Sequence, residues 1–225
     1  MQRIKTAAFL LGALLFCSTV NAQEMDSLSY SLGVLLASNL QQQGFDELDE
    51  ASLTAAIKDV MAGKEVKISP QQANGIVQQY MQKKQAAQMD AQKAVGAENK
   101  AAGEAFLKEN AQREEVTELP SGLQYEVLQE GSGEKPTKDS KVTVHYHGTL
   151  IDGSVFDSSV ERGQPASFGV TQVIAGWTEA LQLMPEGAKW KLYIPSDLAY
   201  GERSPSPKIG PNSALIFEVE LLEVQ

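Results

Sequence analysis

The sequence predicts an α+β protein in two parts: a helical N-terminal half that ends in a long helix, and a small antiparallel sheet packed on one short helix. Two patterns lead to this prediction. From residue 26 to about residue 115, apolar residues recur every three or four positions, as on one face of a helix. From about residue 119 onward they alternate with polar residues, as on the two faces of a half-buried strand.

The first 22 residues are predicted to be a cleaved secretory signal. A basic start precedes an apolar run over residues 7–16 that is too short to span a bilayer comfortably, and Ala22 ends a small-x-small cleavage site. Two alternatives remain: an uncleaved membrane anchor, and a lipoprotein attached through Cys17. The bulky Phe16 before that cysteine disfavours the lipoprotein. We therefore expect export across the inner membrane to the periplasm or cell envelope.

Charge and cysteine content narrow the function. The formal net charge is −10, and no basic patch is present that would neutralise phosphates, so the sequence argues against nucleic-acid binding. Cys17 is the only cysteine, so a chain cut after Ala22 would fold without disulfides. The acidic balance itself favours solubility.

Two amphipathic helices are predicted first. One carries leucines from Leu28 to Leu40 and is stopped by Gly44; the other begins at Asp49 as its cap and runs to Met61. Two helices of this size bury little by themselves, so their leucine faces need a partner surface. The long helix or a second copy of the chain could supply it.

A third helix is predicted from Pro70, capped by Ser69, to about Asn110. Its length would be roughly 60 Å at 1.5 Å per residue. The apolar stripe is thin, which indicates a solvated spacer, and Gly96 and Gly103 weaken the helix and allow bending. The alternative is a flexible, partly helical linker.

The second half is predicted to be a sheet with one apolar and one polar face. In its first strand Leu123 and Val127 alternate with Gln124 and Glu126. Further alternating runs lie around residues 142–147, 190–194 and 215–221. One short helix interrupts them, with apolar residues at Trp177, Leu181 and Met184 and a stop at Pro185. A helix against one face of such a sheet makes a small α+β domain.

Motifs for covalent, nucleotide or metal chemistry are missing from the sequence. It contains no Gly-x-Ser-x-Gly, no phosphate loop and no dinucleotide fingerprint. His145 and His147 could be two metal ligands, but no cysteine or nearby carboxylate completes a set, so histidines on a wet sheet face are the preferred interpretation. We expect no metal and no cofactor.

Aromatic residues are the remaining signal. Tyr146, Phe168 and Phe217 point to the apolar face, and Trp177 opens the helix that would cover it. This pattern fits an ordinary aromatic core as well as an apolar binding groove. Asp157 either caps the turn that follows it or pairs with Arg162 at the rim of a pocket.

Several motifs bear a specific resemblance to a known family. Residues 118–225 resemble the FKBP-type, macrolide-binding peptidyl-prolyl cis-trans isomerases through VHYHGTLIDGSVFDSS, VIAGW, MPEG, IPSDLAYG and ALIFEVELLEV. Residues 25–112 resemble the helical dimerisation domain of macrophage-infectivity-potentiator-like members, beginning with DSLSYSLG. The resemblance implies a half-barrel sheet wrapped on the short helix. It also implies four segments: a signal peptide (1–22), a helical dimerisation region (23–68), a long stalk helix (69–115) and an isomerase domain (118–225).

The resemblance also implies a site. The catalytic residues would be Tyr146, Asp157, Tyr200 and Trp177, and the substrate-binding residues would be Phe156, Arg162, Phe168, Val173, Ile174, Ile209 and Phe217. Within this set, Trp177 is the pocket floor, and the Ile174 N–H and the Tyr200 hydroxyl bind substrate carbonyls. Two departures stand out. Ala166 replaces an aromatic wall residue, and the loop 202–211 carries prolines in place of the family's usual residues.

The implied function is a peptidyl-prolyl isomerase that assists folding of exported proteins by desolvating and twisting the prolyl bond. Its partners would be proline-containing unfolded or nascent exported proteins, a second copy of the chain in a homodimer, and macrolide inhibitors. The alternative is a dimeric holdase whose proline pocket captures clients with little catalysis.

Overall fold

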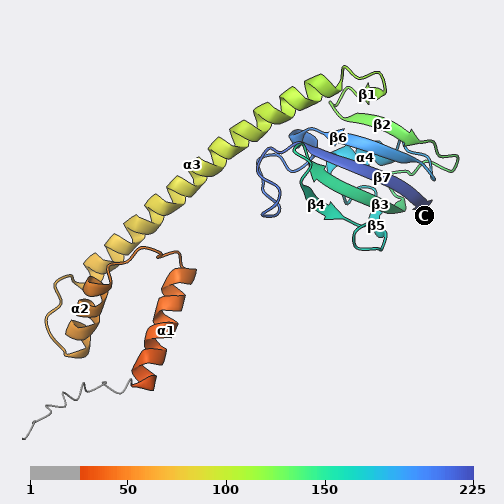
Figure 1. Cartoon of the computed structure of the whole chain (residues 1–225). Helices are drawn as coiled ribbons and strands as arrows, with labels where there is room; N and C mark the ends of the chain where they lie inside the picture. Colours follow the sequence, from red (N-terminus) through yellow and green to blue (C-terminus); the bar gives the residue numbers. More distant parts are fainter. Residues whose placement is uncertain (1–25) are drawn as a thin grey trace, which may run out of the picture. The chain divides into compact units, whose positions relative to one another are not determined.

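The structure, a computed structural model, describes residues 26–225. The predicted signal peptide and Cys17 lie outside these residues. The chain divides into two compact units with the boundary between Pro70 and Gln71, and each is described by itself (Figure 1). Within the described range, no helix combines the length and the apolar stretch that crossing a membrane requires.

The first unit contains α1 (Ser27–Gln42) and α2 (Glu50–Met61). Each begins at an aspartate whose carboxylate accepts a backbone N–H one turn along: Asp26 from Ser29 at 3.0 Å, and Asp49 from Ser52 at 2.8 Å. These bonds satisfy N–H groups that have no partner inside the helix. Gly44 follows α1 with φ 82° and Gly63 follows α2 with φ 64°, a conformation that glycine adopts without strain. The predicted starts and stops of both helices are confirmed.

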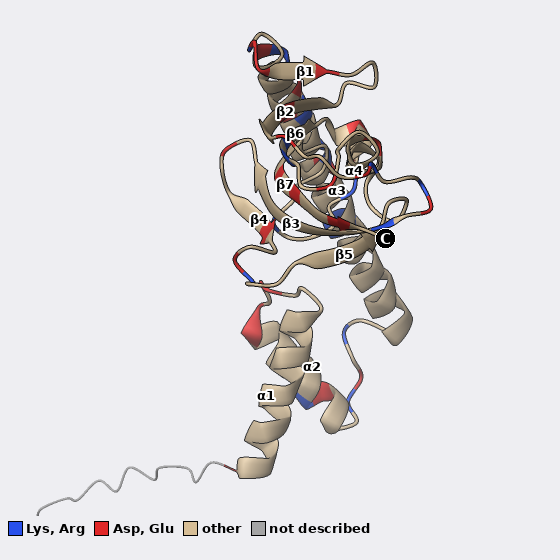
Figure 2. Cartoon of the chain, turned by 90° about the vertical axis from the view of Figure 1, so that its right-hand side faces the viewer, with Lys and Arg blue, Asp and Glu red and all other residues tan. Residues whose placement is uncertain are grey.

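The apolar faces of α1 and α2 are uncovered within one chain. Neither helix has a buried residue. Figure 2 shows that α1 also carries no Lys, Arg, Asp or Glu along its length. Its exposed fractions reach 70% at Leu28 and 66% at Leu35. An uncharged helix with exposed leucines on this scale is typical of an element that packs against another surface.

The second unit begins within the first turn of α3 (Pro70–Asn110), one continuous helix of 41 residues. The predicted long helix is therefore confirmed, and the alternative of a partly helical linker is not what the structure shows. The prediction of a solvated spacer is wrong for the last turns. Gly96, Gly103 and Asn110 are buried, because this part of α3 lies against the loop before the last strand and against the edge of the sheet. The two glycines are contact points and not the flexible points that the sequence suggested.

Seven strands form one open sheet in which every neighbouring pair is antiparallel. The strand order is β1-β2-β6-β7-β3-β4, and β5 also pairs with β3. Their bounds are β1 (Val116–Glu118), β2 (Gln124–Gln129), β3 (Lys141–Leu150), β4 (Val155–Ser158), β5 (Ala166–Gly169), β6 (Lys189–Ile194) and β7 (Leu215–Val224). A short 3-10 helix, η1 (Ser196–Leu198), follows β6.

The core lies between the sheet and α4 (Ala175–Leu181). Trp177 and Leu181 of this helix, and Met184 just after it, pack against buried residues of β3, β6 and β7. Gly176 lets the helix approach closely, because a Cβ there would lie 2.6 Å from Cγ2 of Ile194. The predicted α+β class is confirmed: helices come first, and one short helix then packs on an antiparallel sheet.

The opposite face of the sheet is not uniformly solvated. In the alternating pattern of β2, Gln124 is one of the residues on the polar face, yet only 1% of it is exposed. Its amide donates to the Leu107 carbonyl of α3 at 2.9 Å, and its oxygen accepts from Asn110 at 2.9 Å. Gln124 lies on the predicted polar face but is buried, because the end of α3 covers it.

Candidate active site

A cavity of about 600 Å³ opens at the concave, aromatic side of the sheet. Its walls come from β3, β4, β5, β7, the start of α4, and the segment between η1 and β7. The lining residues are Tyr146, Phe156, Asp157, Phe168, Gln172, Val173, Ile174, Trp177, Tyr200, Pro205, Ser206, Ile209 and Phe217. This volume suits a small ring and its flanking peptide groups.

Trp177 is the centre of the aromatic wall and only 4% of it is exposed. Three rings meet it near a right angle: Phe217 at 5.2 Å, Tyr146 at 5.5 Å and Phe168 at 6.0 Å between centroids. Edge-to-face contacts of this kind are favourable and hold each ring in one orientation. The cavity is therefore bounded by a rigid apolar surface.

Gly148 of β3 makes room for this wall. A Cβ there would lie 2.7 Å from the Phe156 ring and 2.8 Å from the Phe217 ring, far inside normal contact. The two rings pack edge to face with centroids 5.3 Å apart directly over this glycine. The glycine within the VHYHG motif is thus needed for the shape of the cavity, a role that strand alternation does not reveal.

A polar network closes one side of the cavity. The Tyr146 hydroxyl donates to Asp157 at 2.5 Å, and Arg162 donates to both the Asp157 carboxylate and the Tyr146 hydroxyl. The Arg162 guanidinium also lies 5.5 Å from the Tyr146 ring centroid. Ser159 helps to hold β3 in place at Tyr146, because its Oγ accepts the Tyr146 N–H at 2.8 Å.

This network keeps Asp157 ionised. Partial burial opposes its charge, but the hydrogen bonds from Tyr146 and Arg162 outweigh it, so the pKa of Asp157 lies below its ordinary value. Burial and the neighbouring carboxylate raise the pKa of the Tyr146 hydroxyl, and Arg162 opposes that rise. The site therefore presents a fixed carboxylate and a neutral phenol.

Three hydrogen-bond donors around the cavity have no partner within the described part of the chain. The Trp177 indole N–H is buried without an acceptor. Ile174 sits just before α4, and its backbone N–H donates no bond there. Tyr200, 36% exposed, lines the cavity with a hydroxyl that takes part in no hydrogen bond among these residues. Such donors are available to the carbonyl oxygens of a bound peptide.

His145 and His147 lie on the other face of β3 from Tyr146. Their Nδ1 atoms are 3.1 Å from the Ser159 hydroxyl and 3.0 Å from the Ser158 hydroxyl. Over residues 26–225, no group of three or more His, Cys, Asp or Glu side chains gathers as metal ligands would. The structure thus gives these histidines serine partners at the end of β4 and in the turn just after it.

Comparison with known families covers both halves of the chain. The family described as FKBP-type peptidyl-prolyl cis-trans isomerase matches residues 132–222. The domain described as amino terminal to FKBP-type peptidyl-prolyl isomerase matches residues 25–127. The chain belongs to the FKBP-type peptidyl-prolyl cis-trans isomerases. It is therefore an isomerase of prolyl peptide bonds.

Relatives of this isomerase match it over most of their length. It is 44% identical to the outer membrane protein MIP of Legionella longbeachae, over 90% of this chain and 86% of that protein. It is 43% identical to the FKBP-type 22 kDa peptidyl-prolyl cis-trans isomerase of Escherichia coli, over 92% of this chain and 96% of that protein. The crystal structure of FkpA from Escherichia coli superposes with a TM-score of 0.68 at 38% identity, covering 88% of this chain and 93% of that chain.

The predicted site residues of the isomerase come together in space. All of them except Arg162 line the cavity, although they come from segments up to 71 positions apart, from Tyr146 to Phe217. Arg162 stands behind the wall, where it binds Asp157 and the Tyr146 hydroxyl. The alternative in which Asp157 pairs with this arginine at the rim is the one that the structure shows.

Three lining residues were not among the predicted site residues: Gln172, Pro205 and Ser206. Gln172 directly precedes the predicted site residue Val173, and this adjacency is the sequence signal that could have identified it. Pro205 and Ser206 lie in the loop that departs from the family, where the sequence offered no matching residue. Ala166 opposes Val144 across β3 and β5 and is not a lining residue, so the cavity wall on β5 comes from Phe168.

Proposed function

We propose that this cavity is where the isomerase acts, with the proline ring of the substrate held against Trp177. The observation that carries the proposal is the combination of a rigid aromatic wall with unpartnered donors at Ile174 and Tyr200. The wall excludes water from the ring, and the two donors bind the carbonyls on either side of it. Phe156, Phe168, Val173, Ile209 and Phe217 complete the apolar enclosure.

The proposed mechanism needs no covalent step. Rotation about a prolyl bond is opposed by roughly 20 kcal/mol because amide resonance is lost in the twisted state. Water stabilises the planar, polar amide, so transfer into an apolar cavity favours the twisted form. An acceleration of about 10⁴-fold needs only about 5.5 kcal/mol. Desolvation and two aimed hydrogen bonds are enough for that.

Asp157 has the second polar role in the proposal. Its carboxylate stands beside the carbonyl of the isomerising bond and repels the planar, polarised form, while Arg162 and Tyr146 hold it in place. Because two donors keep this carboxylate charged, we assign it an electrostatic role and no proton transfer.

Two substitutions test the site. Tyr200→Phe and Asp157→Ala should each lower kcat/KM in protease-coupled isomerisation of short proline peptides, by roughly tenfold for the loss of one aimed polar group. Tyr125→Phe, a tyrosine outside the cavity that stacks on Trp190, and Asp139→Ala, on an exposed turn, are the matched controls. Full activity in both Tyr200→Phe and Asp157→Ala, with the melting temperature of wild type, would show that the chemistry lies elsewhere.

We also propose that the protein is a homodimer formed by its helical region. This assigns residues 23–68 to dimerisation, 69–115 to the linking helix and 118–225 to the isomerase domain. The exposed leucines of an uncharged α1 support the proposal, since one chain leaves them in water. Light scattering tests it: Leu32→Glu with Leu36→Glu should yield a monomer, and a wild-type monomer would refute the dimer.

A holdase is the second candidate function. Exposed apolar side chains on the first half of α3 favour it, because they offer contact to an unfolded chain: Ile76 54%, Val77 47% and Met89 51% exposed. A macrolide that fills the cavity separates the candidates. It should abolish isomerisation of peptides, and it should leave suppression of client aggregation intact if the helices alone hold the client.

The proposed setting is the cell envelope, with proline-containing exported proteins as clients. The name of the Legionella relative, an outer membrane protein, supports this location. The predicted mature chain begins at Gln23. Intact mass of protein from the native envelope tests both points, and a lipid-bearing species that starts at Cys17 would replace this proposal by lipid anchoring.

A further inference from the structure

The loop between Gly201 and Asn212 forms part of the cavity wall. Pro205, Ser206 and Ile209 of this loop line the cavity, and Ile209 is only 5% exposed. The loop is braced inside by the Ser204 hydroxyl, which donates to the Ile209 carbonyl at 2.6 Å. The two ends of the loop are joined because the Asn212 N–H donates to the Gly201 carbonyl at 2.7 Å. We call the returning end, residues 210–212, the neck of the loop. The loop is therefore braced internally and closed where its two ends meet.

The neck is bound to α3. The Asn99 amide donates to the Pro211 carbonyl at 2.9 Å, across 112 positions of sequence. In the opposite direction, the Asn212 amide donates to the Gly96 carbonyl at 3.3 Å. Asn212 has φ 54°, the only positive φ outside glycine among residues 26–225. Asparagine adopts this left-handed conformation more readily than most residues, and here its side-chain amide is bonded to α3.

Small residues give this contact a close fit. A Cβ at Gly96 would lie 3.1 Å from the Asn212 amide nitrogen, and one at Gly210 would lie 2.8 Å from the Asn99 amide nitrogen. About two helical turns after Gly96, a Cβ at Gly103 would lie 3.0 Å from the Ala214 Cβ. By contrast, a Cβ at Gly75 in the same helix would meet nothing within 4 Å. Helix and neck therefore have little freedom to shift past each other.

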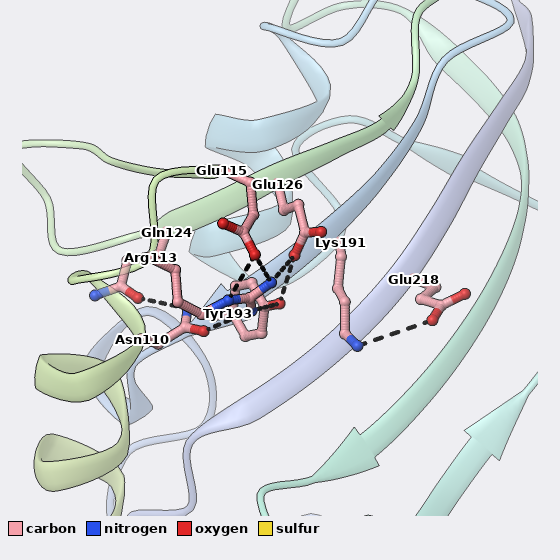
Figure 3. A network of polar contacts seen from close by, with 8 residues as sticks. All are labelled: Asn110, Arg113, Glu115, Gln124, Glu126, Lys191, Tyr193 and Glu218. Carbon is pink, nitrogen blue, oxygen red and sulfur yellow. Dashed lines mark hydrogen bonds and ion pairs between the residues drawn. The ribbon is translucent and has the colours of Figure 1, made fainter.

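A second anchor fixes the end of α3 to the sheet (Figure 3). The Asn110 amide donates to the buried Gln124 oxygen at 2.9 Å. Arg113, just beyond the helix, donates to the Tyr193 hydroxyl at 2.8 Å and pairs with Glu126 at 2.9 Å. Because the end of α3 is anchored to β2 and β6, Gly96 and Asn99 are held in a fixed position beside the neck.

We propose that α3 is a positioning element of the active site: Asn99 and Gly96 hold the neck at 210–212, so that Pro205, Ser206 and Ile209 stay against the cavity. The inference rests on the proposed assignment of the cavity as the isomerase site. Pro205 and Ser206 are not part of the apolar enclosure proposed for the proline ring, so we assign them to contact with the residues that flank the proline, with Ile209 joining the two regions. The position of α3 therefore sets selectivity for the peptide around the proline.

Full-length variants with matched controls on the same helix test this inference. The test variants are Asn99→Ala and Gly96→Ala, and the controls are Asn74→Ala and Gly75→Ala. Both control positions are exposed on α3, and a Cβ at Gly75 would meet nothing within 4 Å. Each is assayed by protease-coupled isomerisation with peptides that differ only in the residues flanking proline. We expect the ratio of kcat/KM between bulky and small flanking residues to change by about 3- to 10-fold in the test variants, the size of one lost hydrogen bond, and to stay constant in the controls.

A second readout is independent of activity. The Ile209 and Lys208 amides bond to Ser206 inside the loop, and their hydrogen exchange should accelerate in Asn99→Ala while that of β7 is unchanged. Unchanged ratios and unchanged exchange in both test variants overturn the inference. So does a loss of activity that is equal for all peptides and follows a fall in melting temperature, because that is a structural effect only.

The pocket variant Tyr200→Phe is assayed in parallel. If Tyr200→Phe loses activity and the α3 variants keep the wild-type ratio, the site assignment stands and the positioning role is refuted. If Tyr200→Phe and Asp157→Ala both keep full activity, the site assignment fails, while the ratios and exchange rates of the α3 variants still decide whether the helix holds the loop.

Discussion

Asp157 illustrates how a single side chain depends on its neighbours in this site. Nearly half of its side chain is exposed, 45%, yet Tyr146 and Arg162 hold both carboxylate oxygens. Burial resists its charge, the two donors overcome that resistance, and its pKa falls below the ordinary value. Arg162 therefore contributes to the site through Asp157 and Tyr146, although it lies outside the cavity wall.

The lowered pKa predicts a pH dependence of stability. A carboxyl group whose pKa is lower in the folded state stabilises the fold above its unfolded pKa of about 3.9, and this contribution is lost as the pH falls through the folded pKa. The difference in unfolding free energy between wild type and Asp157→Asn should thus be constant above about pH 5 and shrink below about pH 4. Urea unfolding at a series of pH values measures it, with Asp139→Asn as the control.

Trp177 carries both the core and the cavity, so its loss should differ in kind from that of Tyr200. Trp177→Ala removes a ring that touches three others and should lower stability by about 3–5 kcal/mol as well as activity. Tyr200→Phe should lower activity alone, since its exposed hydroxyl has no partner to lose among the described residues. Urea unfolding and peptide kinetics on the same samples separate the two effects, and equal stability losses would contradict the assignment.

At the scale of elements, α3 has two different parts. Its first half is exposed, while Gly96, Gly103 and Asn110 of its second half are buried against the isomerase domain. The junction combines close contacts at glycines and hydrogen bonds from amides with a ring contact between Phe106 and Tyr193, whose centroids are 6.0 Å apart. This part of the helix therefore packs through more than a hydrophobic stripe.

Removal of one amide tests the anchor at the end of α3. Asn110→Ala leaves the buried Gln124 oxygen without a donor, which should lower the free energy of unfolding by about 1–3 kcal/mol. The double variant Asn110→Leu with Gln124→Leu should recover much of that loss, because no buried polar group is then left unpaired. Urea unfolding of both, beside Asn74→Ala, measures this. A single variant as stable as wild type would show that the bond contributes nothing.

For the whole molecule, the boundary between Pro70 and Gln71 suggests a division of labour. A fragment of residues 71–225 keeps every cavity residue and both anchors of α3. It lacks α1 and α2, so we expect a monomer that isomerises short peptides as well as the full chain does. A fragment of residues 116–225 keeps the cavity residues but loses Asn99 and Asn110, and should be less stable with altered selectivity.

Refolding of a whole protein is the corresponding test of the helical region. Both fragments should lose most of the ability to speed proline-limited refolding, because capture by a dimer raises the effective concentration of prolyl bonds at two linked sites. Light scattering and refolding assays on the three chains measure this. A 71–225 fragment that refolds clients as well as the full chain would remove the reason proposed for dimerisation.

The sequence by itself determined the elements and their faces. Asp26, Asp49 and Pro70 mark helix starts, and alternation identifies the strands, because these signals depend on residues close together in the chain. Most cavity residues were also predicted, since the motifs that carry them match the family in order and spacing.

Only the tertiary structure decided how α3 meets the sheet. Local rules describe Gly96 and Gly103 as weak points of a helix, and Gln124 only as a residue of the polar sheet face. Their actual roles come from contacts between Asn99 and Pro211, and between Asn110 and Gln124, where the partners belong to different elements. Such contacts depend on the position of one element on another, and that position is set by the packing of the whole unit, which no periodicity in either segment records.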